Sequence, residues 1–171
     1  MQFTSKEQLS TYFWDNPGMQ RLLITQSPGL KSLPELPGTL IDLKISGCPD
    51  LTSLPKLPQT LNLLYVEDCS SLVTLAGLPS TLSTIIAHNC PFLTFVPALP
   101  KSLVYLDIVA CPNLMVLPAL PEKTKSLNLS FCLGLKNLPA LPENLSCLTL
   151  NDCIQLQALQ ALPSKLQHLK V

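Results

Sequence analysis

The repeat unit of this chain is clearest at residues 33–53, which read LPELPGTLIDLKISGCPDLTS. The cysteine of this unit returns every 21 residues, and the flanking segments align without an insertion, as the column Cys48, Cys69, Cys90, Cys111, Cys132 and Cys153 shows. Six full copies cover residues 33–158, a degenerate copy fills 12–32, and a partial copy occupies 159–171. One such unit cannot close a hydrophobic core alone, so the period predicts a solenoid in which stacked copies share a continuous core.

Each copy contains one short strand and one proline-rich return. Within residues 40–46, Leu43 and Ile45 alternate with Asp42, Lys44 and Ser46, which is typical of a strand with one buried face. The following L-P-x-L-P segment cannot be α-helical, because proline lacks an amide donor and restricts the residue before it to extended conformations. We therefore expect about eight parallel strands on the concave side and an extended, polyproline-like convex side.

The first residues depart from the repeat. Ser5 and Gln8 form a plausible capping box, and Leu9, Tyr12 and Phe13 fall on one helical face. We predict a helical cap at residues 1–18 and the repeat domain at 19–171. At the other end Val171 aligns with Ile45, so the predicted last strand has an unpaired edge, and either the natural chain continues or something covers that edge.

Composition excludes several classes of function. The 11 basic and 11 acidic residues cancel, so the chain lacks the positive charge that binding to nucleic acid requires. No run approaches the 18 apolar residues of a membrane span, and the first residues do not resemble a cleavable signal peptide, so we expect no membrane insertion. Seven cysteines without a signal then indicate free thiols in a reducing compartment such as the cytosol.

These motifs resemble the leucine-rich repeat proteins, over about residues 19–171. The L-P-x-L-P return is most similar to the repeats of secreted bacterial effectors of the Yersinia outer protein M and Shigella invasion plasmid antigen groups, although those repeats usually carry Asn in place of Cys and are one residue shorter. The 21-residue form with Cys is closer to Legionella effectors, and Ile45-Ser46-Gly47-Cys48-Pro49 is similar to plant disease-resistance receptors. The resemblance implies an α/β leucine-rich-repeat solenoid.

The same resemblance implies non-catalytic recognition of a protein, most plausibly a host protein bound by a bacterial effector in the host cytosol. Such an effector would leave the bacterium by a secretion system that needs no cleaved signal. We expect a monomer without cofactor or metal. The resemblance also leaves open that the chain is the ligand-sensing part of a longer immune receptor or ubiquitin ligase.

The outward positions of the predicted strands vary from copy to copy, whereas the core positions do not. Stacked strands turn equivalent positions into columns, and large apolar and aromatic residues gather in the columns of the middle copies. Isolated exposed apolar residues are ordinary, but aromatic anchors surrounded by polar groups are typical of binding sites. We predict that the partner binds at a central patch made of Leu63, Tyr65, Ile86, His88, Tyr105, Asp107, Val109 and Phe131.

Two sets of residues invite other readings. The cysteine column could suggest zinc, but its thiols should point in parallel along the stack rather than converge, so we expect them to be structural. Cys147 lies outside that column and faces His168 on the next predicted strand, which is the minimal arrangement of an activated thiol and makes a thiol enzyme the less favoured alternative. The columns also predict two charged pairs, Arg21 with Asp42 and Glu67 with His88.

Overall fold

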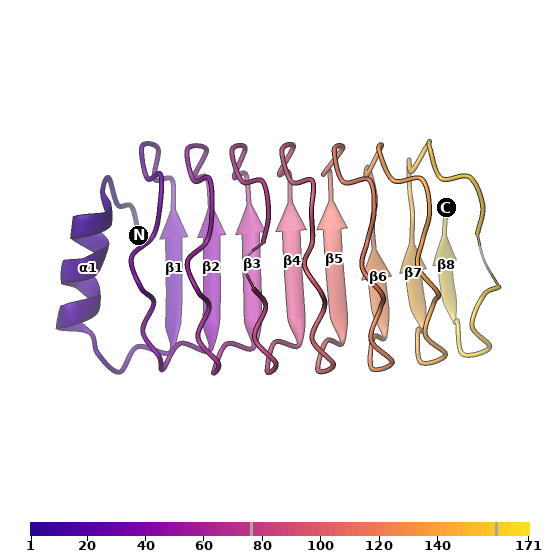
Figure 1. Ribbon diagram of the computed structural model, residues 1–171, viewed down its shortest axis with the longest axis horizontal. Helices are drawn as coiled ribbons and strands as arrows, with labels where there is room; N and C mark the ends of the chain where they lie inside the picture. The colour runs from indigo at the N-terminus through magenta and orange to yellow at the C-terminus, as the bar shows by residue number, and fades with distance from the viewer. Residues whose placement is uncertain (76, 160) are drawn as a thin grey trace.

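A computed structural model describes residues 1–75, 77–159 and 161–171. Over these residues the chain forms one helix and eight short strands, and it advances along the stack from one strand to the next (Figure 1). The elements are α1 (Lys6–Asp15), β1 (Arg21–Thr25), β2 (Asp42–Ser46), β3 (Leu63–Glu67), β4 (Thr84–His88), β5 (Tyr105–Val109), β6 (Ser126–Asn128), β7 (Cys147–Thr149) and β8 (His168–Lys170).

The eight strands form one parallel sheet in the order of the sequence, which confirms the predicted leucine-rich-repeat solenoid. Every pairing joins residues 21 apart, as between Leu43 and Leu64, so the sequence period becomes the register of the sheet. Strands β1–β5 are five residues long, and β6 has only three. At β6 the side-chain oxygen Oδ1 of Asn128 accepts the backbone N–H of Ser130 at 3.1 Å, so that amide does not extend the ladder.

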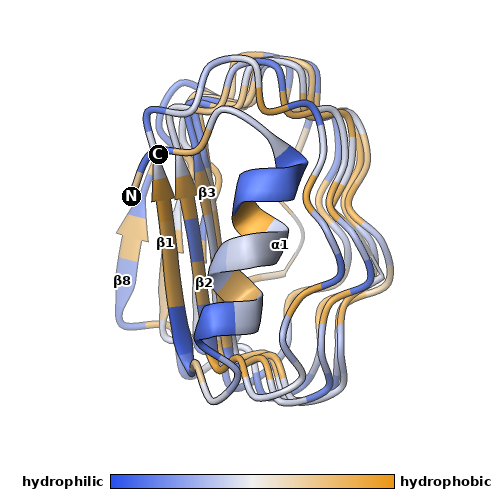
Figure 2. Ribbon diagram, turned by 90° about the vertical axis from the view of Figure 1, so that its left-hand side faces the viewer, coloured by the Kyte–Doolittle hydropathy of each residue, from blue (hydrophilic) through white to orange (hydrophobic). Residues whose placement is uncertain are grey.

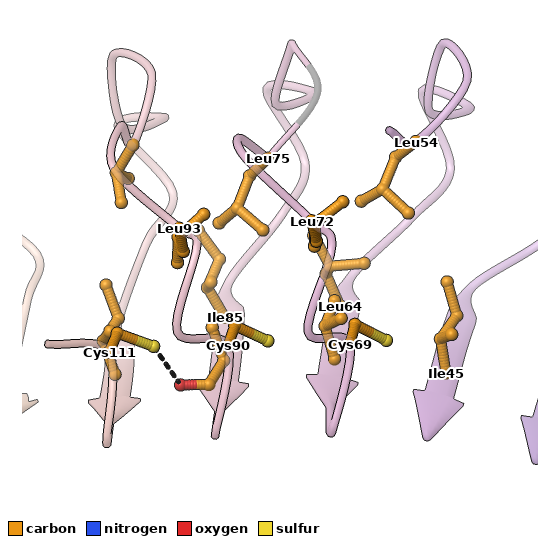
Figure 3. Close-up of a cluster of buried hydrophobic side chains, with 14 of the residues drawn as sticks. Ile45, Leu54, Leu64, Cys69, Leu72, Leu75, Ile85, Cys90, Leu93 and Cys111 are labelled. Carbon is orange, nitrogen blue, oxygen red and sulfur yellow. Dashed lines mark hydrogen bonds between the residues drawn. The ribbon is translucent and has the colours of Figure 1, made fainter. Parts of the chain in front are cut away.

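The core lies between the sheet and the extended returns, and α1 covers its first end (Figure 2). Buried leucines fill each turn of the stack, and Figure 3 shows how those of neighbouring turns pack in rows. Threonine side chains link neighbouring turns by hydrogen bonds. The Thr60 hydroxyl, for example, donates to the carbonyl oxygens of Gly38 and Leu40 at 2.8 and 2.7 Å. The returns contain turns and extended chain but no helix over their described residues, as the prolines predict.

A left-handed residue ends the strand segment of each turn, immediately before the cysteine or, in the first copy, before Ser27. Phe131, which was predicted to lie in the patch on the sheet, belongs to this column, where the chain turns toward the core. The φ angles are 49° at Gln26, 66° at Gly47, 52° at Asp68, 50° at Asn89, 55° at Ala110, 60° at Phe131 and 56° at Asp152. Gly, Asn and Asp tolerate this region best, whereas Ala and Phe carry strain there.

Helix α1 begins where the sequence predicts. The Ser5 hydroxyl accepts the Gln8 amide at 3.4 Å, and the Gln8 side chain in turn accepts the Thr4 amide at 2.8 Å. Leu9 is fully buried against the first turn of the stack. Residues before the helix also reach the sheet, where the Thr25 amide donates to the carbonyl oxygen of Met1 at 2.7 Å. No helix in the described part of the chain has the length and apolar character needed to cross a membrane.

Candidate functional site

The predicted central patch lies on the exposed face of β3, β4 and β5, which we call the sheet face. The register aligns Leu63 with Thr84 and Tyr105 in one row, Tyr65 with Ile86 and Asp107 in the next, and Glu67 with His88 and Val109 in the third. Seven of the eight predicted residues thus lie on three adjacent strands. Phe131, the eighth, lies in the turn after β6.

The apolar members of the patch are partly covered by their neighbours. Leu63, Tyr65, Ile86 and Val109 are half-buried. Tyr105 exposes 37% of its surface and Phe131 exposes 47%. Phe131 is also the bulkiest residue in the left-handed column, and its strained backbone holds an aromatic ring in solvent, where the ring contributes nothing to the core.

A polar cluster runs through the middle of the patch. The Tyr105 hydroxyl donates to Oδ2 of Asp107 at 3.2 Å. Nε2 of His88 lies 3.3 Å from Oδ1 of Asp107, close enough for an ion pair, but neither atom has a partner in hydrogen-bonding geometry. The Tyr65 ring meets the His88 ring edge-on at 6.1 Å between centroids. The cluster therefore joins all three strands through side chains.

The burial of Asp107 differs from the prediction. The residue was predicted to face the solvent, yet it is only 8% exposed, because the larger side chains of the patch surround its carboxylate. Glu67 and His88 are aligned in the register, as predicted. The charged contact of His88, however, is with Asp107, at 3.3 Å, while Glu67 accepts the Ser46 hydroxyl at 3.1 Å. The Arg21–Asp42 pair is confirmed, at 3.1 Å.

Both tyrosines of the patch are kept neutral. Burial, together with the neighbouring Glu67 carboxylate, raises the pKa of Tyr65 to about 12. Burial and the negative charge of Asp107 raise the pKa of Tyr105 above its usual value. Each phenol is therefore a hydrogen-bond donor at neutral pH and presents an uncharged aromatic ring to a partner.

The cysteine column is part of the core. Cys48, Cys69, Cys90, Cys111 and Cys132 are all fully buried, and their thiols donate to backbone carbonyl oxygens; Cys111, for example, lies 3.7 Å from the carbonyl oxygen of Ala87 (Figure 3). Burial raises the pKa of the Cys132 thiol to about 12, which disfavours the thiolate that binds metal. Among the described residues, no three His, Cys, Asp or Glu side chains form a group that could hold a metal ion.

Cys147 and His168 are paired in the register of β7 and β8, as predicted. Cys147 is half-buried, His168 is exposed, and each lies on an open sheet surface rather than in a cleft. The arrangement has a thiol and a nearby imidazole, but no hydrogen bond joins them in the described part of the chain. Nothing in this geometry orients a base toward the thiol.

Two further surfaces were not predicted from the sequence. An exposed apolar group lies on the return side, where Thr74 forms a β-bridge with Phe95, and it consists of Val73, Phe92, Phe95, Met115 and Val116. A cleft of about 670 Å³ lies between α1 and the first return, lined by residues that include Phe13, Pro34 and Trp14, which is 85% exposed. The sequence signal for the first group was the appearance of large apolar residues at repeat positions that other copies fill with polar or small residues.

Comparisons with known proteins give little beyond this. No family model matches the chain, and a search of curated proteins finds no match. Among solved structures, the chain is similar to YopM from Yersinia enterocolitica WA-314, with 27% sequence identity and a TM-score of 0.49. The match covers 88% of this chain and 42% of YopM, so the chain spans less than half the length of that protein.

Proposed function

We propose that this chain is a non-catalytic protein-recognition module that binds a partner protein through the central patch of its sheet face. The observation that carries the proposal is the gathering of two tyrosines with half-buried aliphatic residues on three adjacent strands. Large aromatic residues at the middle of a surface, surrounded by polar groups, are the usual anchors of protein interfaces.

The scaffold supports this proposal. A solenoid holds its core positions constant while the outward positions are free to vary, so it presents a rigid surface of adjustable chemistry. Preorganised rings lose little conformational entropy on binding, which favours affinity. The hydrogen bond from Tyr105 to Asp107 and the contact of Tyr65 with His88 hold both rings in place before a partner arrives.

More specifically, the module is a bacterial effector that acts on a host protein. It is supported by the L-P-x-L-P returns, which resemble those of secreted effectors. The partner would then be a cytosolic host protein.

The test is affinity capture from eukaryotic cell lysate, followed by mass spectrometry and by direct binding of the purified partner. The double variant Tyr65→Glu/Tyr105→Glu should lose the partner while its melting temperature stays within a few degrees of wild type. The matched control is Phe95→Glu, which changes a more exposed aromatic residue on the return side and should retain the partner. A partner that binds the double variant as tightly as wild type contradicts the proposal.

A further inference from the structure

The first return of the stack lies beside helix α1, whereas the later returns lie beside one another (Figure 1). Figure 2 views the stack from this end and shows α1 between the sheet and the returns. The cleft of about 670 Å³ lies where α1 faces residues 34–37 of the first return. Its volume is in the range of ligand-binding pockets. The cleft therefore takes the place that a preceding return has at the later turns.

Backbone hydrogen bonds join neighbouring returns in parallel. The Thr52 amide donates to the carbonyl oxygen of Lys31 at 3.3 Å, and the same bond recurs two turns later between Thr94 and Val73, at 3.0 Å. Each of these amides points to the preceding turn. The Lys31 amide has the same repeat position, but it donates to no acceptor among the described residues. The first return thus keeps an open donor on the side on which α1 lies.

The walls of the cleft suit a chain rich in proline. Phe13 and Trp14 line it from α1, and Trp14 is 85% exposed. Residues 34–37 line it from the other side with two prolines and a leucine. Proline-rich segments bind in grooves lined by aromatic residues, because their polyproline II conformation is formed before binding and costs little entropy to hold. The cleft combines such an aromatic wall with the side of a return on which other returns pack.

We propose that this cleft binds an extended proline-rich segment of a partner protein, of the same L-P-x-L-P kind that the chain itself stacks. The segment lies parallel to the first return, as the second return does on the opposite side. One of its backbone carbonyl oxygens accepts the Lys31 amide, and its apolar side chains pack on Phe13 and Trp14. The cleft is separate from the central patch, so the inference goes beyond the proposed function and does not depend on it.

Charge favours a lysine at the middle position of the bound segment. Among the described residues that line the cleft, Glu35 alone is charged. On its other side the second return places Lys56 at the aligned position, and both residues line the groove of about 260 Å³ between the two returns. A segment that reads L-P-K-L-P repeats this pairing across the cleft, whereas L-P-E-L-P places two carboxylates together.

The segment comes from a different protein rather than from a second copy of this chain. The inner returns already have a neighbouring return on each side, and their leucines are buried in the core, as Leu54 and Leu57 are. They would have to leave the stack in order to enter the cleft of another molecule. A flexible segment of a partner has no such contacts to lose.

The first test uses tryptophan fluorescence, since Trp14 is the one tryptophan of the chain. Acetyl-Thr-Ser-Leu-Pro-Lys-Leu-Pro-Gln-amide has the sequence of residues 52–59 and contains no aromatic residue. It should shift the Trp14 emission to shorter wavelength with saturation, because it removes water from the indole ring. The peptide with alanine in place of both prolines is not preorganised and should bind at least about fivefold more weakly. No saturable shift up to about 10 mM, or equal affinity of the two peptides, overturns the inference.

The second test locates the peptide by NMR. The amide signals of α1 and of the first return should shift, and the Lys31 amide should exchange with solvent more slowly. Trp14→Ala should weaken the peptide by about tenfold, because it removes an exposed aromatic wall. The matched control is Phe92→Ala, which removes an exposed aromatic side chain outside the cleft and should not change the affinity. Shifts centred on Phe92, or equal effects of the two variants, contradict the inference.

The third test exchanges charges. The wild-type chain should bind the lysine peptide about twofold to fivefold more tightly than the same peptide with glutamate at that position, a modest factor because Glu35 is exposed. Glu35→Lys should reverse this order. An order that stays the same in the variant would place the peptide outside the cleft and refute the inference.

Two further measurements fix the site and the source of the segment. The Tyr65→Glu/Tyr105→Glu variant should bind the peptide as tightly as the wild-type chain, so its failure in the capture experiment and a failure of the cleft are distinguishable. Loss of the peptide in that variant would mean that the two sites are not separate. Sedimentation should show a monomer, and a dimer that Trp14→Ala dissociates would make the occupant a second copy and overturn the inference.

Discussion

Thr124 is a single residue at odds with its place in the core. It occupies the repeat position that Leu40, Leu61, Leu82, Leu103 and Leu145 fill elsewhere, and like them it is fully buried. Its hydroxyl has no hydrogen-bond partner among the described residues. A buried, unsatisfied hydroxyl is destabilising, so this position weakens the sixth turn of the stack.

We therefore expect Thr124→Val to raise the free energy of unfolding by about 1–2 kcal/mol, because it removes the hydroxyl and keeps the shape. Urea denaturation followed by circular dichroism measures this. The control is Thr60→Val, which should lower the stability by about 1 kcal/mol, since the Thr60 hydroxyl donates to two carbonyl oxygens. Destabilisation by Thr124→Val would show that the hydroxyl is satisfied in solution.

The left-handed column makes a second prediction at the scale of single residues. Gly47 has φ 66°, and a Cβ atom there would lie 3.3 Å from the backbone nitrogen of Gln26. Gly47→Ala should cost about 1–2 kcal/mol, from left-handed strain and this close approach. Ala110 has φ 55° and already carries the strain, so Ala110→Gly should stabilise by up to about 1 kcal/mol.

The two substitutions make opposite changes at the same repeat position, so each serves as a control for the other. Thermal melts of both variants should move in opposite directions. A shift of the same sign in both would mean that side-chain contacts, rather than backbone conformation, dominate at this column.

At the scale of elements, helix α1 covers an end of the core that no further turn of the stack covers. Leu9 is its fully buried contact with the first turn. Because each turn of a solenoid contacts only its neighbours, damage to the cap should spread a short distance along the stack. This distinguishes a cap from a helix that supports the whole fold.

Leu9→Ala should lower the free energy of unfolding by about 3 kcal/mol, as a buried cavity does. Hydrogen exchange should show protection lost first in β1 and β2, while the amides of β5 keep theirs. Ser10→Ala, at an exposed position of the same helix, should leave both regions protected. Uniform loss of protection along the stack would contradict nearest-neighbour behaviour.

At the scale of the whole molecule, the raised pKa values of the Cys132 thiol and the Tyr65 phenol make the folded state less stable at alkaline pH. Burial raises the pKa of Cys132 from 9.0 to about 12, and burial with the neighbouring Glu67 carboxylate raises the pKa of Tyr65 from 10.0 to about 12. In the unfolded chain both groups lose their protons at lower pH than in the native state. Rising pH therefore favours unfolding, and their stabilisation, complete below about pH 9, should disappear by about pH 12.

The urea midpoint should stay nearly constant from pH 6 to 8 and fall steadily between pH 9 and 12. Tyr65→Phe should make the fall between pH 10 and 12 shallower and leave the midpoint at pH 7 almost unchanged. A midpoint that is independent of pH up to 12 would mean that these groups are solvated in the native state.

The repeat, the strands and the proline-rich returns follow from the sequence alone. A 21-residue period leaves one consistent way to stack the leucines, and proline forbids helix in the returns, so local chemistry and the global core agree. The N-terminal helix followed in the same way from Ser5, Gln8 and Leu9. The register alone likewise brought seven of the eight predicted patch residues onto β3–β5, whereas Phe131 lies in the turn after β6.

Side-chain contacts in the folded chain account for the features that the register does not predict. Periodicity gives the strand and the face of a side chain but not its direction, so the burial of Asp107 depended on its contacts with Tyr105 on the same strand and with His88 on β4. The left-handed turn before each cysteine of the repeat column follows from the entry of the chain into the core, which the sequence pattern did not show. The apolar group on the return side and the cleft beside Trp14 likewise arise from segments that meet only in the folded chain, since surface contacts depend on three-dimensional proximity.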